Sequence, residues 1–157
     1  MADTKTLDGP LKRPWFEWKR EVGEPGCSYL QRTMLDVRLF SIRLHHFRGD
    51  DDDRALHDHP WWFFTLILKG GYTDVSEDEE RNPVYTPMKR GRLYFRKAHH
   101  KHTVKVNPGG VWTLCLMGPR TRDWGFWTET KGGKYRWFKA NKYFSAHGHH
   151  KPTHPCE

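Results

Sequence analysis

The chain has 157 residues, a length that fits one domain with short tails and excludes a second catalytic module. Nine Phe, eight Trp and six Tyr outnumber the Val, Ile and Leu residues together, so we predict a largely aromatic core. The formal net charge of +8 arises mainly in residues 91–157, where 13 basic residues accompany 3 acidic ones, which is compatible with an anionic partner.

Apolar runs are short throughout the chain. None approaches the roughly 18 residues of a membrane span, and residues 1–14 lack the apolar stretch of a secretory signal. Cys27, Cys115 and Cys156 are an odd number at wide spacing, which fits a reducing compartment better than a disulfide framework. We therefore predict a cytoplasmic protein with no membrane partner and no need of disulfides.

The first half of the chain begins with an arm and continues with strands. Residues 1–27 hold several Pro and Gly around a short aromatic cluster, and we expect an N-terminal arm that docks by its aromatic rings. Apolar and polar residues alternate over 29–47, which predicts a strand. A solvated acidic turn follows at 49–54, and residues 55–71 then predict one long strand closed by a Gly pair.

Short strand segments alternate with polar turns along the rest of the chain, and no convincing amphipathic helix interrupts them. This pattern predicts an all-β sandwich or barrel over residues 28–144. Residues 145–157 are rich in His and predict a flexible tail, either without a role or able to bind metals loosely.

Histidines are frequent, with 11 in the chain, and two groups have a spacing that suits a metal site. His57 and His59 lie two residues apart on a predicted strand, so they share one face while Asp58 points to the other. His100 and His102 share a face for the same reason. Imidazole is the commonest ligand of Zn, Fe, Cu and Ni, so the two groups predict one metal site. Hydrogen-bonded histidines are the alternative for either group alone.

These residues resemble the motifs of the cupin superfamily of small β-barrels. In that family the first motif has the form G-x5-H-x-H-x3,4-E-x6-G, and the second has the form G-x5-P-x-G-x2-H-x3-N. The matching residues are His57, His59, Gly70 or Gly71, Gly91 and His102. The resemblance covers about residues 35–125 and implies a cupin-type β-barrel, a double-stranded β-helix or jelly roll.

Two departures from the motifs affect what the resemblance implies. Phe63 or Phe64 stands where the family has its Glu ligand, and neither side chain can bind a metal. The residues in place of the Pro, Gly and Asn of the second motif are Lys97, His99 and Val106. Without the Glu, the implied ligand set is the three matched histidines, which resembles the three-His thiol dioxygenase branch of the superfamily.

The resemblance implies a divalent transition metal, with Fe(II) as the first choice and Zn, Ni, Mn or Cu as alternatives. A three-His set leaves coordination positions open for substrate and dioxygen, which suits oxygen-dependent chemistry. His100 is a further candidate, either as a fourth ligand or as a residue that orients a bound group.

The segment after the paired histidines is strongly aromatic, and Trp61 and Phe63 are candidates for the wall of a small-molecule pocket. A packed barrel core is the alternative for these two rings. Candidates for binding a carboxylate or phosphate lie on neighbouring predicted strands, and they are Arg43, Arg92, Tyr94 and Arg96. Solvated side chains on the outer face are the alternative for the arginines.

Three functions are compatible with these features. The first is a metal-dependent cupin, an Fe(II)-dependent enzyme that uses oxygen to act on a small anionic molecule. The second is a non-catalytic cupin that binds a small ligand or a structural metal. The third is a protein that binds a polyanion or another partner through the basic residues 91–157, although no nucleic-acid-binding module is recognisable. We also expect a homodimer, since small cupins pair through barrel strands and the aromatic arm can cross to a second subunit.

Overall fold

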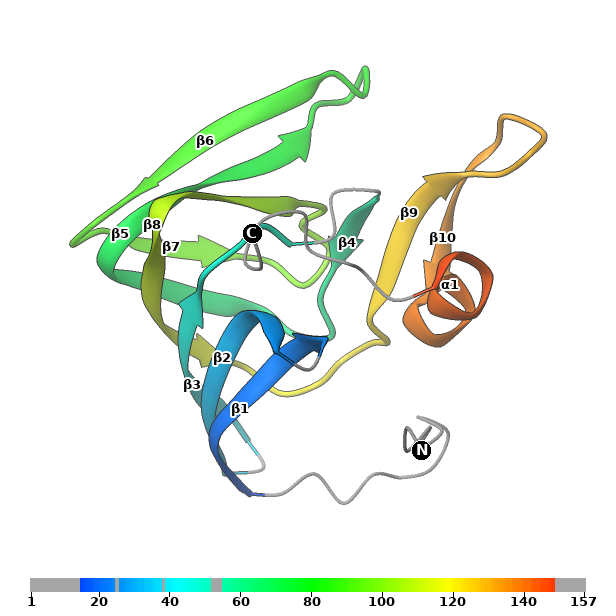
Figure 1. Cartoon of the computed structure of the whole chain (residues 1–157). Coiled ribbons are helices and arrows are strands. Elements are labelled where there is room, and N and C mark those ends of the chain that lie inside the picture. Colours follow the sequence, from blue (N-terminus) through cyan, green and yellow to red (C-terminus); the bar gives the residue numbers. More distant parts are fainter. Residues whose placement is uncertain (1–14, 25, 38, 52–54, 149–157) are drawn as a thin grey trace.

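The computed structural model of the chain describes residues 15–24, 26–37, 39–51 and 55–148. Strands form most of this part, and a short helix follows the last of them (Figure 1). The strands are β1 (Phe16–Glu24), β2 (Cys27–Asp36), β3 (Ser41–Phe47), β4 (Leu56–Asp58), β5 (Phe63–Glu77), β6 (Pro83–Lys89), β7 (Leu93–Arg96), β8 (Thr103–Met117), β9 (Gly125–Glu129) and β10 (Tyr135–Lys139), and the helix is α1 (Ala140–His147). The described residues include no helix that is long and apolar enough to span a membrane.

Two antiparallel sheets make up the described part of the fold. The larger has the strand order β1-β2-β3-β8-β5-β6, with β7 also paired to β5, and the smaller has the order β10-β9-β4. Figure 1 shows the larger sheet curving around itself, with β9, β10 and α1 standing to one side. The two sheets do not close into a complete barrel. The prediction of an all-β fold is confirmed.

The longest strands, β5 and β8, have 15 residues each and organise the larger sheet. They pair with each other along most of their length, while β7 and β6 share the other edge of β5. The pairing is irregular near Gly70, which has a φ of 73°. A Cβ there would clash with the carbonyl oxygen of Gly110, so only glycine fits. Gly70 is one of the two residues that match the closing glycine of the first cupin motif.

Two predicted strands are each divided in the structure. The predicted strand over 29–47 is a hairpin of β2 and β3, and residues 37, 39 and 40 lie between the two strands. The predicted strand over 55–71 is interrupted between β4 and β5, where Pro60 has no N–H to donate to a neighbouring strand. Apolar alternation continues through both breaks, which is why the pattern alone does not reveal them.

The described part of the predicted arm contributes a strand to the larger sheet, because β1 pairs antiparallel with β2. The rings that we expected to dock are exposed in the single chain, at 73% for Trp15 and 67% for Trp18. Residues 1–14 of the predicted arm lie outside the described residues.

The sequence shows no convincing amphipathic helix, but the structure has one short helix, α1. In α1, Tyr143 is buried and its ring stacks on that of Phe126 in β9 at 4.2 Å. Ala55, Phe126 and Phe138 belong to the same apolar cluster as Tyr143, and this packing stabilises a helix that the eight-residue sequence would not form alone. Residues 149–157 of the predicted tail lie outside the described residues.

Side-chain alternation divides the central strands into an inner and an outer face. On β8, Val111, Thr113, Cys115 and Met117 are buried, whereas Leu114 and Leu116 are exposed. The buried apolar residues include Ile67, Met88 and Val104 as well as aromatic rings, so the core is more mixed than the composition predicts. The inner faces of β3, β5 and β8 surround the residues of the candidate site.

Candidate metal centre

Backbone pairing between β4 and the segment before β8 brings three histidines together. His57 and His102 form an antiparallel bridge, in which each backbone N–H donates to the other residue's carbonyl, at 2.9 and 3.0 Å. His59 donates its backbone N–H to Ala98 O at 2.9 Å, which holds the loop after β7 against the end of β4. His57 and His102 are buried, and His59 is partly buried.

The ring nitrogens of the three histidines converge. One nitrogen from each of His57, His59 and His102 lies within 4.8 Å of the other two. The Nε2 atoms of His59 and His102 are 2.9 Å apart. Two nitrogens bound at right angles to one ion, each at about 2.1 Å, are separated by about 3.0 Å, so this spacing fits adjacent ligands of one metal. The structure thus groups the three residues that the cupin motifs imply as ligands, while metal binding itself stays a prediction.

Ligation also requires neutral rings. Burial, with the neighbouring charges of His57 and His102, holds the pKa of His59 well below its ordinary value. The ring of His59 is therefore neutral near pH 7 and has a lone pair available for a metal ion.

Asp74, on the inner face of β5, supports the site. Its side chain is 1% exposed and accepts hydrogen bonds from His102 Nδ1 at 2.9 Å and His100 Nε2 at 3.0 Å. Burial alone would raise the pKa of Asp74, but the hydrogen bonds and charges of the two histidines hold it well below its ordinary value. An ionised carboxylate only accepts, so Nδ1 of His102 carries a proton, and Nε2 is the ring nitrogen that faces the other histidines.

His100 contacts the other oxygen of the Asp74 carboxylate, and its ring centroid lies 5.1 Å from that of His102. It belongs with Asp74 and His102 in a second group whose possible ligand atoms also lie within 4.8 Å of one another. Arg96 approaches the same carboxylate, with Nε 3.4 Å from Oδ2. His100 and Arg96 therefore both hold Asp74 in place.

A second carboxylate comes from the acidic segment before β4. Asp51 Oδ2 lies 3.4 Å from His57 Nε2, and Asp50 accepts the backbone N–H of Val106 at 2.6 Å. The sequence predicts a solvated turn here, but these two residues are partly buried and tie the segment to the site and to β8. The other acidic residues of the turn, 52 and 53, lie outside the described residues.

Asp58, between the two motif histidines, points the other way and anchors the smaller sheet. It is 0% exposed and accepts hydrogen bonds from the indole N–H groups of Trp127 and Trp137, at 3.0 and 3.1 Å. Arg122 forms an ion pair with it at 2.9 Å. These contacts fix β4 against the β9–β10 hairpin and so fix the position from which His57 and His59 extend.

Three of the predicted substrate-binding residues are buried near the histidines. Phe63 packs against the ring of His59, with 4.8 Å between ring centroids. The guanidinium of Arg43 lies 4.5 Å from the ring centroid of Trp61, and Arg43 Nε donates to Ser41 Oγ at 3.2 Å. An arginine thus lies inside the barrel, stacked on an aromatic wall.

The structure does not bring Arg92 and Tyr94 to the histidines. Arg92 is exposed in the turn before β7. The hydroxyl of Tyr94 accepts the backbone N–H of Lys89 at 2.9 Å, and its ring packs against the cluster around Ile67. Among the described residues, neither is linked to the three grouped histidines by a hydrogen bond or ring contact.

The interior also contains a buried polar group that the sequence did not indicate. Cys115 Sγ lies 3.5 Å from the hydroxyls of Thr65 and Thr113 and 3.8 Å from His45 Nδ1. Burial, with the charge of Arg43, lowers the pKa of His45 to about 3, and burial raises the pKa of the Cys115 thiol. Both side chains are therefore neutral, and the pair is not an activated nucleophile.

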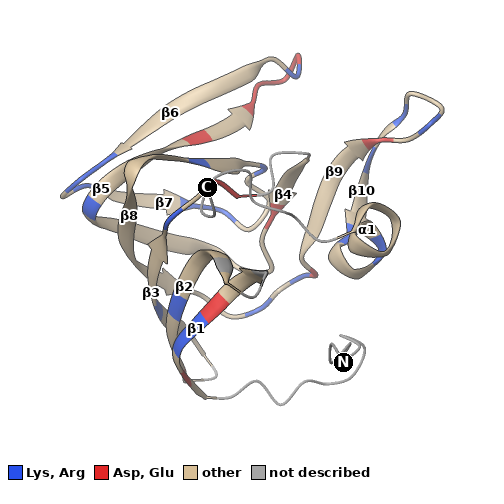
Figure 2. Cartoon of the chain, in the orientation of Figure 1, with Lys and Arg blue, Asp and Glu red and all other residues tan. Residues whose placement is uncertain are grey.

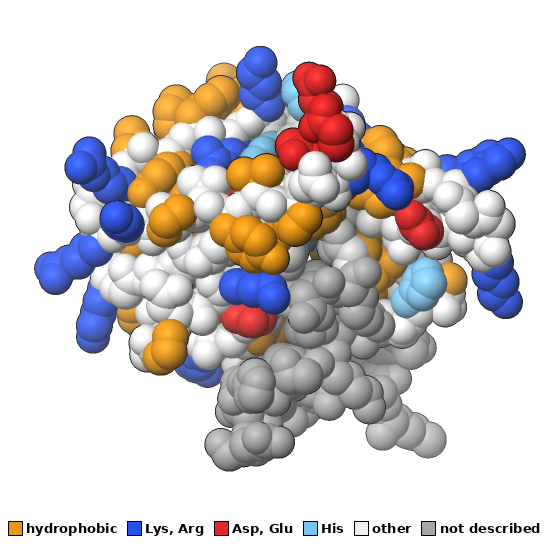
Figure 3. Space-filling view, turned by 90° about the horizontal axis from the view of Figure 1, so that it is seen from above, with side chains coloured by type: hydrophobic (Ala, Val, Ile, Leu, Met, Phe, Trp, Pro, Cys, Tyr) orange, Lys and Arg blue, Asp and Glu red, His pale blue; other side chains and the backbone are white. Residues whose placement is uncertain are grey.

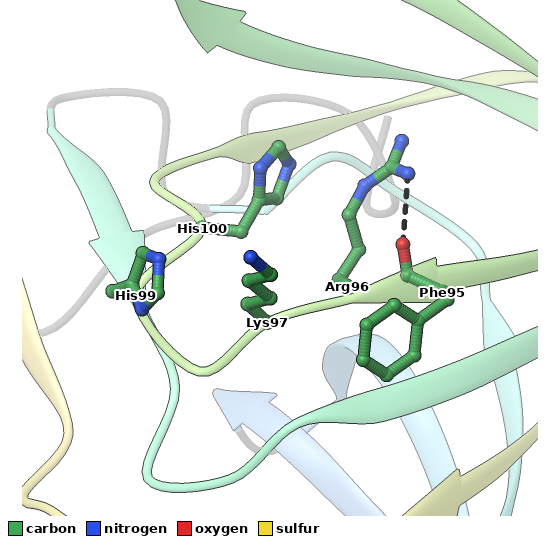
Figure 4. A pocket seen from close by; sticks show the side chains of 5 residues that line it. All are labelled: Phe95, Arg96, Lys97, His99 and His100. Atoms are coloured by element: carbon green, nitrogen blue, oxygen red, sulfur yellow. Dashed lines mark hydrogen bonds between the residues drawn. The ribbon is translucent and has the colours of Figure 1, made fainter.

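A surface pocket of about 320 Å³ lies beside His100. It is lined by Phe95, Arg96, Lys97, His99 and His100. Figure 4 shows Arg96, Lys97 and His100 extending to one side of the chain, while the ring of Phe95 turns to the other. The pocket therefore presents cationic and imidazole groups next to the carboxylate that holds His102.

The fold and the histidine cluster together define an open, curved antiparallel β-fold with a candidate metal site on its inner side. The sequence matches no protein-family model, and it matches no curated protein.

Solved structures share this fold. The Fe(II) form of HppE matches 74% of this chain and 62% of its own, with a TM-score of 0.51 and 18% identity. Oxalate decarboxylase from Bacillus subtilis matches 80% of this chain and 30% of its own, with a TM-score of 0.54 and 12% identity. Hydroxypropylphosphonic acid epoxidase from S. wedmorenis matches 57% of this chain and 50% of its own, with a TM-score of 0.46 and 21% identity.

At such identities the likeness concerns the fold alone, and the two structures with TM-scores of 0.51 and 0.54 support it. This chain spans between 30% and 62% of the length of those three proteins.

Proposed function

We propose that the chain is a metal-dependent cupin enzyme that uses oxygen to transform a small anionic molecule. The metal is a divalent transition ion held by His57, His59 and His102, with Fe(II) as the first candidate and Zn, Ni, Mn or Cu as alternatives. The observation that supports this most strongly is the convergence of the three rings within 4.8 Å. The Fe(II) form of HppE, which has the same fold, favours iron among these metals.

The surroundings of the site give each residue a role. When bound, Fe(II) supplies positions for dioxygen and substrate beside three imidazoles. Asp74 holds the proton on Nδ1 of His102, so that Nε2 keeps its lone pair for the metal. Phe63 covers the ring of His59 with an apolar surface that limits the access of water.

Positive charge beside the site supports an anionic substrate. Arg96 and Lys97 line the pocket next to His100, and both can pair with a carboxylate or phosphate. His100 and His102 both contact the carboxylate of Asp74, so an anion bound beside His100 would lie close to the metal ligand His102. Arg43, buried against Trp61, supplies a third cation from the inner side of the fold.

Elemental analysis of the full chain tests the metal site. Wild-type protein and the double variant His57→Ala/His59→Ala are loaded anaerobically with Fe(II), desalted and compared. Both chains carry the same His-rich tail, so metal bound there cancels in the comparison. We expect one equivalent of iron more in the wild type, followed by oxygen uptake with small thiols or carboxylates. Equal metal content in the two proteins would contradict the proposal.

A non-catalytic cupin is the second candidate. The observation in its favour is that Trp61, Phe63 and Arg43 are buried and pack inside the barrel, where a substrate would otherwise lie. A wild-type protein that binds one metal but consumes no oxygen with any tested substrate supports this function instead.

Polyanion binding receives little support from the distribution of charge. Lys and Arg lie on many separate strands and turns (Figure 2). On the face seen in Figure 3 they are spread around the outline, and the acidic side chains form the denser group.

We further propose that the chain forms a homodimer and acts in the cytoplasm.

A further inference from the structure

Asp51 lies against His57, one of the three grouped histidines, although it belongs to neither of the cupin motifs. Its Oδ2 atom is 3.4 Å from Nε2 of His57, and its side chain is 19% exposed. The backbone N–H of Asp51 donates to Val104 O at 3.0 Å. Asp50 Oδ1 accepts the N–H of Val106 at 2.6 Å, so both acidic residues are tied to the start of β8. These contacts place the carboxylate of Asp51 at the edge of the candidate site.

The spacing of Asp51 and His57 is that of two ligands of one metal ion. Ligand atoms at about 2.1 Å from an ion are about 3.0 Å apart at a right angle and about 3.4 Å apart at the tetrahedral angle. Asp51 Oδ2 and His57 Nε2 have the second separation, 3.4 Å. The Nε2 atoms of His59 and His102, at 2.9 Å, are close to the first. An N–H···O hydrogen bond is usually about 2.7–3.2 Å long, so the contact of Asp51 with His57 is longer than such a bond.

Charge gives a second reason for a carboxylate ligand. Neutral imidazoles leave a dication with both of its positive charges, and this site is largely buried. Asp74 contacts His102 through Nδ1, whereas Nε2 faces the other histidines, so Asp74 is separated from the ion by a ring. Asp51 needs no intervening ring, and its direct contact with the ion would neutralise one of the charges.

We propose that Asp51 is a fourth ligand of the metal, so that three imidazoles and one carboxylate bind the ion. This rests on the proposed function, because it requires a metal at His57, His59 and His102. Asp51 is outside the group whose possible ligand atoms all lie within 4.8 Å of one another. Its carboxylate therefore turns from His57 toward the ion when the metal binds. The acidic segment before β4 becomes part of the metal site.

A carboxylate ligand affects which metal binds and how many positions stay open. Imidazole suits Zn, Cu, Fe and Ni, whereas carboxylate suits Mn, and mixed sets of His and carboxylate with open positions are typical of oxygen-using Fe(II) sites. A six-coordinate ion with four protein ligands keeps two positions, which suffice for one substrate atom and dioxygen. Asp51 therefore favours Fe(II) or Mn among the candidate metals.

Titration of the full chain with Co(II) tests this ligand, because the visible absorption of Co(II) depends on the number and type of its ligands. A competing chelator gives the affinity. Asp51→Asn should bind Co(II) more than about 100-fold more weakly than the wild type, beyond the roughly 10–100-fold loss typical of a residue that only orients a ligand. Its absorption band should also change in position or intensity. His57→Ala/His59→Ala, measured in the same way, gives the Co(II) that is bound elsewhere on the chain.

Asp50→Asn is the matched control, because it removes the same charge one residue away. Its carboxamide oxygen can still accept the N–H of Val106, which keeps the segment on β8. This variant should keep the wild-type absorption band and an affinity close to that of the wild type. Near-ultraviolet circular dichroism checks the fold of each variant. If Asp51→Asn does not fold, Asp51→Glu takes its place, and its longer carboxylate should still bind Co(II) but with a shifted absorption band.

Three results overturn the inference alone. They are wild-type affinity in Asp51→Asn, equal losses of affinity in Asp50→Asn and Asp51→Asn, and weaker binding with an unchanged absorption band. The last would make Asp51 a residue that only positions His57, and an unchanged band in Asp51→Glu has the same meaning. A wild type that binds no more Co(II) than His57→Ala/His59→Ala overturns the proposed metal site and the fourth ligand together.

Discussion

Asp74 is the residue on which the orientation of His102 most directly depends. Replacing it by Asn removes the charge that holds the proton on His102 Nδ1 and leaves a carboxamide that can donate as well as accept. We expect Asp74→Asn to bind a divalent metal about 10–100-fold more weakly. Titration with Co(II) against a competing chelator measures the change.

Glu79→Gln is the control for that substitution. Glu79 is exposed in the turn between β5 and β6, and its replacement removes one negative charge, as Asp74→Asn does. Its affinity should equal that of the wild type. An Asp74→Asn variant with wild-type affinity would show that Asp74 only stabilises the fold.

His45 makes the stability of the protein depend on pH. Its pKa is about 3 in the folded chain because of burial, against about 6.5 when unfolded, so the unfolded chain binds the extra proton between these values. The free energy of unfolding therefore decreases as pH falls through this window, by up to about 1.4 kcal/mol per pH unit from this residue. Urea unfolding at pH 7, 6, 5 and 4 should show a shallower dependence in His45→Gln than in the wild type. An equal pH dependence of the free energy of unfolding in the two proteins would contradict this prediction.

At the scale of the elements, the sequence predicts the grouping of the three histidines because the signal is local. Side chains two apart on a strand share a face, and His102 stands at the spacing of a second cupin motif. Asp74 and Asp51 could not be found in this way. Each reaches the site through long-range contacts, Asp74 through the pairing of β5 with β8 and Asp51 through His57.

Strand content was predictable from alternation, whereas strand ends were not. The break at Pro60 and the turn between β2 and β3 interrupt runs whose apolar pattern continues. Helix α1 escaped prediction because its eight residues depend on packing of Tyr143 against Phe126, which is a tertiary contact.

The β9–β10 hairpin depends on one buried carboxylate. Asp58→Asn leaves Arg122 without an ionised partner and weakens the bonds from Trp127 and Trp137, so we expect a loss of about 3 kcal/mol in the free energy of unfolding. Urea unfolding followed by tryptophan fluorescence measures it. Asp123→Asn, whose ion pairs are solvent-exposed, should leave the free energy of unfolding almost unchanged. Equal losses would mean that Asp58 is not an anchor.

The two motif glycines Gly70 and Gly91 have similar backbone angles and different surroundings. Both have a positive φ, 73° and 76°, but a Cβ on Gly70 would clash with Gly110, whereas Gly91 has open space. Gly91→Ala should cost about 1 kcal/mol of strain, and Gly70→Ala should cost about 3 kcal/mol or more. Thermal unfolding of the two variants compares them. Similar melting temperatures would show that the chain can relax at the bend between β5 and β8.

Over the whole molecule, β3, β5 and β8 each serve two surfaces. Their inward side chains lie beside the candidate site, and outward side chains such as Leu114 and Leu116 are exposed. One residue of register shift would exchange the two sets, placing leucines inside and Arg43 and Cys115 outside. The register of the larger sheet thus determines which side chains face the candidate site.

Metal binding at the three histidines should stabilise the whole chain, whereas binding at the tail should not. A ligand that binds only the folded state adds about 2.7 kcal/mol at 100 times its dissociation constant, which is about 5–10 °C in melting temperature for a chain of this size. His57, His59 and His102 come together only in the fold, because β4 and the segment before β8 are distant in sequence. Histidines that are adjacent in sequence can also bind a metal in the unfolded chain, and such binding stabilises the fold less. Scanning calorimetry at one protein concentration, with Fe(II) under nitrogen, should show the increase in the wild type and its absence in His57→Ala/His59→Ala. An equal increase in both proteins would place the stabilising metal elsewhere.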